Sequence, residues 1–362
     1  MKKIMLIFFF FITTLDIYPV IGTEIKGGYL SNLSGIKDDI ESSYLDGSFY
    51  IYKYFEPSKK IDILTNTNLS FENFFNDTTR DTIYFDTLLG LKLNNPIHTF
   101  FFDIAFSSKF FKKENEENNY LMLYLSPHYI LDLEDLSLYI DPKIGFLNFP
   151  NDIYDKVFFD ISSKFLTDIN WVYKIVLKIG YTKEYYKEYY LLKTITQMSS
   201  EKMNTDIFYF NLNMEYMLSA YINLFLETEV RKTKSNGNYL FYGPNEDTLI
   251  LDGDEQIIND YFSNIYYSAN FQLEYNFSNG RIYPSISYKY ENYNRPPQNS
   301  SQLFETSKSL YISTINFSIG IKLFISKKLN TNIIFSLNNK SSNDYFENVS
   351  FYDFSLSIDY TF

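Results

Sequence analysis

Residues 351–362 read FYDFSLSIDYTF, and from Tyr352 onward every second side chain of this stretch is apolar or aromatic. Small or polar residues stand between these apolar positions. Successive side chains of a strand point to opposite faces, so this alternation predicts a β-strand with one apolar and one polar face. In water, the open edge of such a strand invites aggregation. We therefore expect another element of the protein to cover it.

The composition fits a membrane barrel better than a water-soluble domain. The chain has 362 residues, of which 45% are hydrophobic and 20% aromatic, yet its mean hydropathy is only -0.21. A transmembrane β-barrel reconciles these figures, because the apolar half of each strand faces lipid and the polar half faces a lumen. The codon bias of an AT-rich genome would explain the amounts of Phe and Tyr. It would not explain their alternation.

The N-terminal residues predict a secretory signal peptide over residues 1–22. Lys2 and Lys3 precede an apolar run from 4 to 12, and Val20 and Gly22 have the spacing of a small-residue cleavage site. The apolar run is shorter than the roughly 20 residues that a transmembrane helix needs. Residues 23–362 are then expected to form a single transmembrane β-barrel domain. The chain has no Cys, which excludes disulfides and thiolate metal sites.

Alternating segments recur upstream of the C-terminus and predict about 16 antiparallel strands. The predicted strands are 25–33, 44–55, 60–71, 82–93, 99–109, 120–132, 136–146, 156–166, 170–182, 206–217, 220–231, 264–277, 281–291, 309–325, 328–338 and the C-terminal segment. Short and long connections alternate along the chain, as they do in up-and-down barrels with short periplasmic turns. Long extracellular loops are expected near 183–205, 232–262 and 292–308.

Two prolines leave the strand number open between 16 and 14. Pro127 and Pro142 lie inside neighbouring predicted strands, and proline cannot donate a hydrogen bond to a strand ladder. If both belong to loops or bulges, this hairpin leaves the barrel and about 14 strands remain. We favour 16.

The terminal YDFSLSIDYTF resembles the C-terminal signature of Gram-negative outer-membrane β-barrel proteins of the porin-like kind. The resemblance implies an all-β, transmembrane, antiparallel up-and-down barrel that is integral to the bacterial outer membrane, with its last strand closing against its first. It also implies contact with membrane lipid and lipopolysaccharide, and recognition by the barrel assembly machinery. On this resemblance the insertion signal consists of Phe354, Leu356, Ile358, Tyr360 and Phe362.

Charged residues opposite the apolar faces are candidates for the lining of a pore. A barrel of about 16 strands encloses an aqueous channel, whereas side chains fill one of about 8 strands. Each charge could instead belong to a salt bridge that stiffens the wall. Acidic residues modestly outnumber basic ones, which favours weak cation preference. The candidates are Asp86, Lys92, Asp103, Asp141, Lys143, Asp160, Lys164, Lys174, Lys178, Glu227, Glu229, Arg231, Glu274, Lys289 and Lys322.

The sequence predicts no enzyme, no cofactor and no metal site. The only histidines, His98 and His128, stand beside or near prolines and lack a Gly-rich nucleophile turn, so we expect them to be ordinary turn or wall residues. A lipid-modifying enzyme that uses them is the third-ranked alternative. An acidic stretch at 244–260 contains oxygen ligands suited to Ca²⁺ or Mg²⁺, but it lacks EF-hand spacing. A solvated loop face is the simpler interpretation, and its role is left open.

These observations favour a passive water-filled channel for small hydrophilic solutes or ions. The alternative is a closed or plugged barrel that acts as a surface-exposed adhesin or structural anchor. No basic aromatic patch for nucleic acid is present. Oligomeric state, solute selectivity and the choice between an open and a plugged barrel are not decided by the sequence.

Overall fold

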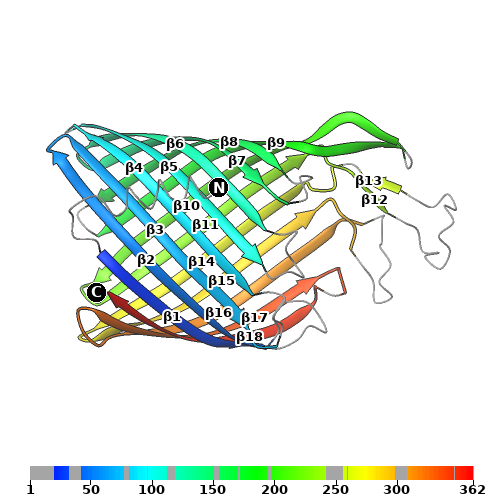
Figure 1. Ribbon diagram of the computed structural model, residues 1–362. Coiled ribbons are helices and arrows are strands. Elements are labelled where there is room, and N and C mark those ends of the chain that lie inside the picture. The colour runs from blue at the N-terminus through cyan, green and yellow to red at the C-terminus, as the bar shows by residue number, and fades with distance from the viewer. Residues whose placement is uncertain are drawn as a thin grey trace.

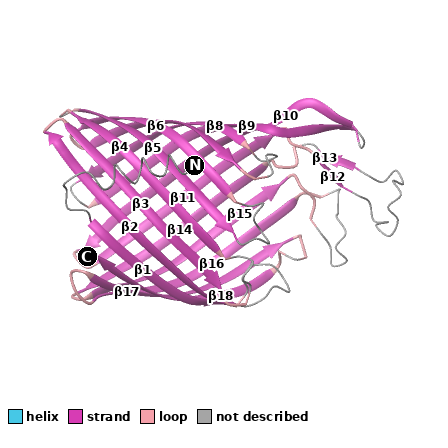
Figure 2. Cartoon of the chain, in the orientation of Figure 1, coloured by secondary structure: helices cyan, strands magenta, loops and turns pink. Residues whose placement is uncertain are grey.

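The strands of the protein run obliquely around a closed barrel (Figure 1). The computed structural model describes residues 20–361 except for 32–41, 77–80, 96, 112–118, 151–154, 170–171, 195–196, 242–255, 259, 298–307 and 346. All regular elements of the described residues are β-strands (Figure 2). Within this part of the chain, no helix is long and apolar enough to cross a membrane.

The described residues form 16 strands of one closed barrel and a separate two-stranded sheet. The barrel strands are β1 (Val20–Leu30), β2 (Ser42–Ser58), β3 (Ile61–Phe74), β4 (Thr82–Asn94), β5 (His98–Phe111), β6 (Tyr120–Leu133), β7 (Leu136–Asn148), β8 (Lys156–Ile169), β9 (Tyr173–Thr194), β10 (Gln197–Ser219), β11 (Ile222–Ser235), β14 (Asn264–Phe277), β15 (Gly280–Tyr293), β16 (Leu310–Phe324), β17 (Leu329–Ser342) and β18 (Val349–Thr361). The small sheet pairs β12 (Tyr239–Phe241) with β13 (Gln256–Ile258). The predicted fold class and the strand number of 16 are confirmed, and the alternative of 14 strands is wrong.

The last strand closes the ring against the first. β18 is antiparallel to β1, from Gly22 opposite Thr361 to Leu30 opposite Asp353, while its other edge pairs with β17. Every other barrel strand also pairs with its neighbours on both sides. The apolar strand that ends the sequence therefore has no open edge. The aggregation that an open edge would invite is avoided, as expected from the sequence. Phe362 lies outside the described residues.

The two prolines stay inside the barrel because they share one position of the ladder. Between β6 and β7 the register runs from Leu125 opposite Ile144 to Tyr129 opposite Ile140, and it lapses between these pairs. Pro127 and Pro142 lie opposite each other inside this gap. Both missing donors thus fall on the same rung of the ladder. Pairing of β6 with β5 and of β7 with β8 continues without a break.

One segment expected as a loop is a hairpin instead. β9 and β10 extend through most of 183–205 and project past the neighbouring strands (Figure 1). The segment is rich in Tyr, which favours strands, although it lacks the simple apolar alternation of the lipid-facing strands. The expected loop at 232–262 contains the end of β11 and the pair β12 and β13, and residues 242–255 lie outside the described part. Of the loop near 292–308, residues 298–307 lie outside it.

The predicted signal peptide, residues 1–22, overlaps the start of strand β1. Residues 1–19 lie outside the described part, so the signal peptide stays a prediction. β1 begins at Val20 and pairs from there with β2. Cleavage after Gly22 would remove the first three paired residues of β1. This would still leave the β1 register intact from Thr23 to Leu30 on both sides.

Apolar side chains lie on the outer surface of the barrel. On β18, Phe354 is 45% exposed and Ile358 is 47% exposed, and Phe335 beside them on β17 is 46% exposed. Ser355 and Ser357, which alternate with them, are buried on the opposite face. Such a distribution is the reverse of a water-soluble domain, and it matches a barrel whose outer surface contacts lipid.

Candidate functional site

The charged residues predicted to line a pore share the inner face of the barrel. Side chains that are direct partners in an antiparallel pair point to the same side of the sheet. The strand pairings therefore show, strand by strand, which residues share the inner face of the ring. Examples are Asp86 opposite Ser107 and Lys143 opposite Asp160. All the pore-lining candidates, from Asp86 on β4 to Lys322 on β16, fall on this face, opposite the exposed apolar side chains. Whether they line a conducting pore stays a prediction.

The structure adds charged residues to the inner face that the candidate set did not include. They include Glu24, Lys26, Asp46, Glu72, Lys156, Glu184, Arg281 and Lys340. Glu24 and Lys26 lie in the first strand, which the sequence pattern located imprecisely. Glu72, Glu184 and Lys340 lie beyond the ends of the predicted strands, whereas period-two counting from neighbouring apolar residues would have included the others.

Carboxylates gather on one side of the inner face, on β18 and β1–β3. Asp46 on β2 is opposite Glu72 on β3, and Glu24 on β1 is opposite Asp359 on β18, which also carries Asp353. We call these five residues the acidic wall. Buried oxygens of Asp46 and Asp353, both Oδ1, have no hydrogen-bond partner among the described residues.

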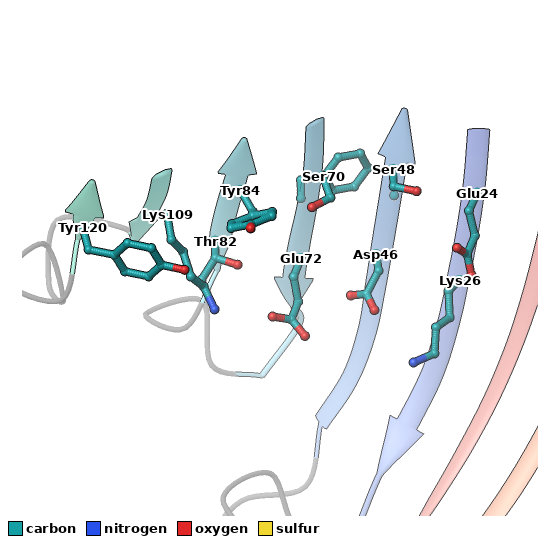
Figure 3. Close-up of a pocket in the computed structure, with 12 residues that line it drawn as sticks. Glu24, Lys26, Asp46, Ser48, Ser70, Glu72, Thr82, Tyr84, Lys109 and Tyr120 are labelled. Carbon is teal, nitrogen blue, oxygen red and sulfur yellow. The ribbon is translucent and has the colours of Figure 1, made fainter. Parts of the chain in front are cut away.

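The acidic wall borders a recess of about 510 Å³ in the inner surface. Glu24, Asp46 and Glu72 project from β1, β2 and β3 on one side of it, with Lys26 beside them (Figure 3). Lys109 and two tyrosines, Tyr84 and Tyr120, line the other side (Figure 3). The recess therefore offers polar groups of both charges to a solute.

Lysines gather on another part of the inner face, on β7–β9. We call Lys143, Lys164, Lys174 and Lys178 the basic wall. None of the four forms an ion pair with any described residue, whereas Lys92, Lys289 and Arg281 elsewhere on the inner face each contact a carboxylate. The basic wall therefore carries charge that the protein does not neutralise by direct contact.

The two walls face each other across the barrel. In the closed strand order, β8 and β9 stand half-way around the ring from β18 and β1.

His128 bridges three strands beside the proline rung. Its Nε2 lies 3.0 Å from Asp103 Oδ2 on β5, and its Nδ1 lies 2.9 Å from Asp141 Oδ1 on β7. A neutral imidazole has one N–H, so donation to both carboxylates requires the imidazolium form. Ser126 Oγ also donates to the carbonyl of Pro142, at 3.1 Å. The Ser126 hydroxyl thus supplies one donor beside the prolines, while His128 links the three strands through side-chain contacts.

The two histidines do not form a common site. His98 starts β5 on the outer face, with Nδ1 2.8 Å from the hydroxyl of Tyr129. His128 is on the inner face. Its register partner is Phe101, which in turn pairs with the inner-face residue Lys92. In the described ranges, no three His, Asp or Glu side chains are placed to hold a metal ion. Most of the acidic stretch 244–260 lies outside those ranges.

Tyrosine rings of the inner face lie over glycines of the neighbouring strand. The Tyr209 ring covers Gly180 on β9, and its hydroxyl reaches across that strand to donate to Asp160 Oδ1 on β8, at 3.1 Å. Tyr283 covers Gly320 in the same way and donates to Asn332. A Cβ atom at Gly180 would occupy the position of the Tyr209 ring. Glycine is required here because of this close approach.

We expect Gly180→Ala to destabilise the folded barrel by about 1–3 kcal/mol, the usual effect of overpacking. The added methyl group displaces the Tyr209 ring and breaks its hydrogen bond to Asp160. Gly27→Ala is the matched control, because a Cβ there meets only a backbone oxygen of Tyr44 at 3.7 Å. Urea unfolding in lipid vesicles, followed by tryptophan fluorescence, measures both. Equal stability of the two variants would contradict the close packing.

Comparison with known proteins identifies the fold. No protein-family model matches the chain, and no curated protein is similar to it in sequence. Among solved structures, a loop L8 deletion mutant of OmpT, an outer membrane protein of Vibrio cholerae, is 10% identical with a TM-score of 0.53 over 95% of this chain and 99% of that one. OpdQ of Pseudomonas aeruginosa is 9% identical with a TM-score of 0.50 over 95% and 98%. The chain has the fold of bacterial outer-membrane β-barrel proteins.

Proposed function

We propose that the protein is integral to the bacterial outer membrane and forms a passive, water-filled channel for small hydrophilic solutes or ions. The observation that carries this proposal is the combination of a closed 16-strand ring with an inner face of charged and polar residues. Barrels of about 16 strands are wide enough to hold an aqueous channel. The apolar outer surface supports membrane insertion, because only closed barrels and helices satisfy their backbone groups in lipid.

The inner wall supports passage of water and solutes. Ion pairs such as Lys92 with Asp62, and Arg281 with Glu274 at 2.8 Å, lie along the wall between neighbouring or nearby strands. These ion pairs hold their charged groups against the wall, and neither pair spans the lumen. All described strands except β12 and β13 belong to the ring itself. The proposed mechanism is diffusion between the acidic and basic walls, with no catalytic step.

Several expectations belong to this proposal. The protein is not an enzyme, and it takes no cofactor. Its outer face contacts lipid and lipopolysaccharide, and the barrel assembly machinery inserts it through the C-terminal strand. Phe354, Leu356 and Ile358 project outward from that strand, where such a signal would be accessible before the ring closes. Carboxylates outnumber cationic groups on the inner face, which favours passage of small cations.

We expect residues 23–362, refolded into detergent and inserted into a planar bilayer, to give stable single-channel steps in molar KCl. The reason is that an aqueous lumen of this width conducts ions without a gating step. Single-channel recording measures the step size directly. Protein heated until unfolded, and an equal volume of detergent buffer, are the controls.

A heat-resistant, strand-rich barrel that never conducts would contradict the channel. That result would favour the alternative of a closed or plugged barrel that displays its loops as a surface adhesin or anchor. The β9–β10 hairpin, which projects beyond the ring, would then be the first segment to test for binding (Figure 1). Loss of an activity on replacing His98 or His128 by Ala would instead indicate an enzyme.

A further inference from the structure

Two lysines of the basic wall are placed directly opposite each other. Lys164 on β8 and Lys178 on β9 are register partners on the inner face, and both are half-buried. Like charges at such positions destabilise a sheet. On the flanking strands, Lys164 pairs with Tyr139 of β7 and Lys178 pairs with Asn211 of β10. Neither of these partners is acidic. Among the described residues, two carboxylate pairs, Asp46 with Glu72 and Glu24 with Asp359, also stand in direct register, whereas Lys164 and Lys178 are both cationic and lie in the basic wall. Such departures from charge pairing are typical of functional sites.

Two carboxylates close to Lys143 and Lys164, Asp160 and Asp141, are engaged by other donors. Asp160 accepts hydrogen bonds from Thr182 at 2.5 Å and from the Tyr209 hydroxyl. Asp141 contacts His128 at 2.9 Å. Although Asp160 is the register partner of Lys143, no ion pair joins them in the described structure. Specific contacts thus occupy the two acids next to Lys143 and Lys164, while Asp168 and Glu215 are register partners of Lys174 rather than of Lys164 or Lys178.

Aromatic rings support the ammonium groups without neutralising them. Lys164 Nζ lies 3.7 Å from the centroid of the Tyr139 ring, and Lys178 Nζ lies 5.4 Å from that of Tyr209. Lys143 Nζ lies 4.4 Å from the ring of Tyr124. A cation above a ring is stabilised by the ring quadrupole and keeps its full charge. Tyr139 is on β7 and Tyr209 is on β10, so the two rings flank the lysine pair and leave both ammonium groups charged on the inner face.

We propose that Lys164 and Lys178 form an oxyanion-binding site in the lumen, which takes the carboxylate or phosphoryl group of a small anionic solute. One oxyanion between the two ammonium groups accepts charge-assisted hydrogen bonds from both and removes their repulsion. The Asn211 amide, next in register to Lys178, supplies a further donor. Lys143 adds positive charge on the neighbouring strand. The site rests on the proposed channel, and it would hold anionic solutes at one place in a lumen whose net charge favours small cations.

The test uses inorganic phosphate as the probe. In about 0.1 M KCl, where charges within about 10 Å are not fully screened, millimolar phosphate is expected to reduce single-channel current in a concentration-dependent way. Lys164→Gln with Lys178→Gln is expected to weaken this block by about tenfold or more, because two charge-assisted hydrogen bonds are lost. Replacing both by Arg keeps the charge and is expected to retain the block within about threefold.

Lys289→Gln is the matched control, since Lys289 is an inner-face lysine that already contacts Glu291 at 3.0 Å. It is expected to leave the phosphate block within about twofold of the original. Equal loss of block in the control and in the double Gln variant would overturn the site, as would conduction without any block. Resistance of each variant to unfolding in detergent on gels shows that the barrel is intact.

Phosphate binding to the folded protein in detergent, measured by calorimetry, separates this site from the channel. Binding that depends on the two lysines without conductance would overturn the channel and leave the site standing. Conductance without phosphate binding would overturn the site and leave the channel standing. Absence of both would overturn both proposals.

Discussion

Deletion of residues 349–362, which removes β18, is expected to abolish folding into lipid vesicles. The deletion takes away the pairing of β18 with both β1 and β17 and leaves two open strand edges. Each backbone group left unpaired in lipid costs several kcal/mol, because no water replaces the lost partner. The total far exceeds the stability of about 5–15 kcal/mol that a folded protein has in reserve.

The deletion also removes the proposed insertion signal. Vesicles that contain no assembly machinery do not depend on this signal, so folding there tests ring closure alone. Deletion of residues 242–255, a segment of equal length between β12 and β13, is the control, because these two strands do not belong to the closed ring. Folding is measured by heat-dependent gel mobility and by protection of the barrel from protease. A protected, heat-modifiable barrel without β18 would show that the ring does not need its last strand.

Phe335→Arg is expected to destabilise the barrel in vesicles by about 2–4 kcal/mol, the usual effect of a cation on the lipid face near the bilayer centre. Phe335 lies in the middle of β17, is 46% exposed on the outer face and pairs with Phe354 and Ile319. The arginine must either stay in hydrocarbon or distort the bilayer to reach water. Urea unfolding in vesicles measures the change in the free energy of unfolding.

Ser336→Arg is the matched control on the next residue of the same strand. Ser336 is on the inner face, where its register partner is Asp353 of the acidic wall. The same arginine there meets a carboxylate and a hydrated lumen, so its effect is expected to stay within about 1 kcal/mol. A reversed order of the two effects would mean that the inner and outer faces have been assigned the wrong way round.

The alternation of side chains predicted most of the fold. It located the barrel strands near their observed positions, and it assigned every pore-lining candidate to the inner face, because a strand has a side-chain period of two. The pattern was less informative at β1, where Gly27 stands at an outward position and Gly22 and Gly28 at inward ones. It did not predict the strands within 183–205, because a hairpin that projects past the ring needs no apolar face and so leaves no period-two signal.

The prolines show why local rules left the strand number open. Each proline, taken alone, argues against a central strand. Only the pairing of β6 with β7 reveals that Pro127 and Pro142 share one rung and that His128 is bound between Asp103 and Asp141 beside it. A defect that two strands share interrupts one ladder once, whereas separate defects would interrupt several.

Which side chains face lipid and which face the lumen follows from the order of residues within each strand, and so does the presence of a polar interior. Which charges become neighbours depends on register and on ring closure, which are properties of strands far apart in sequence. Thus the composition indicates a charged lumen. Only the folded ring places Lys164 beside Lys178 and the acidic wall half-way around from them. The physical reason is that a strand determines the direction of its own side chains, while its partners determine what those side chains meet.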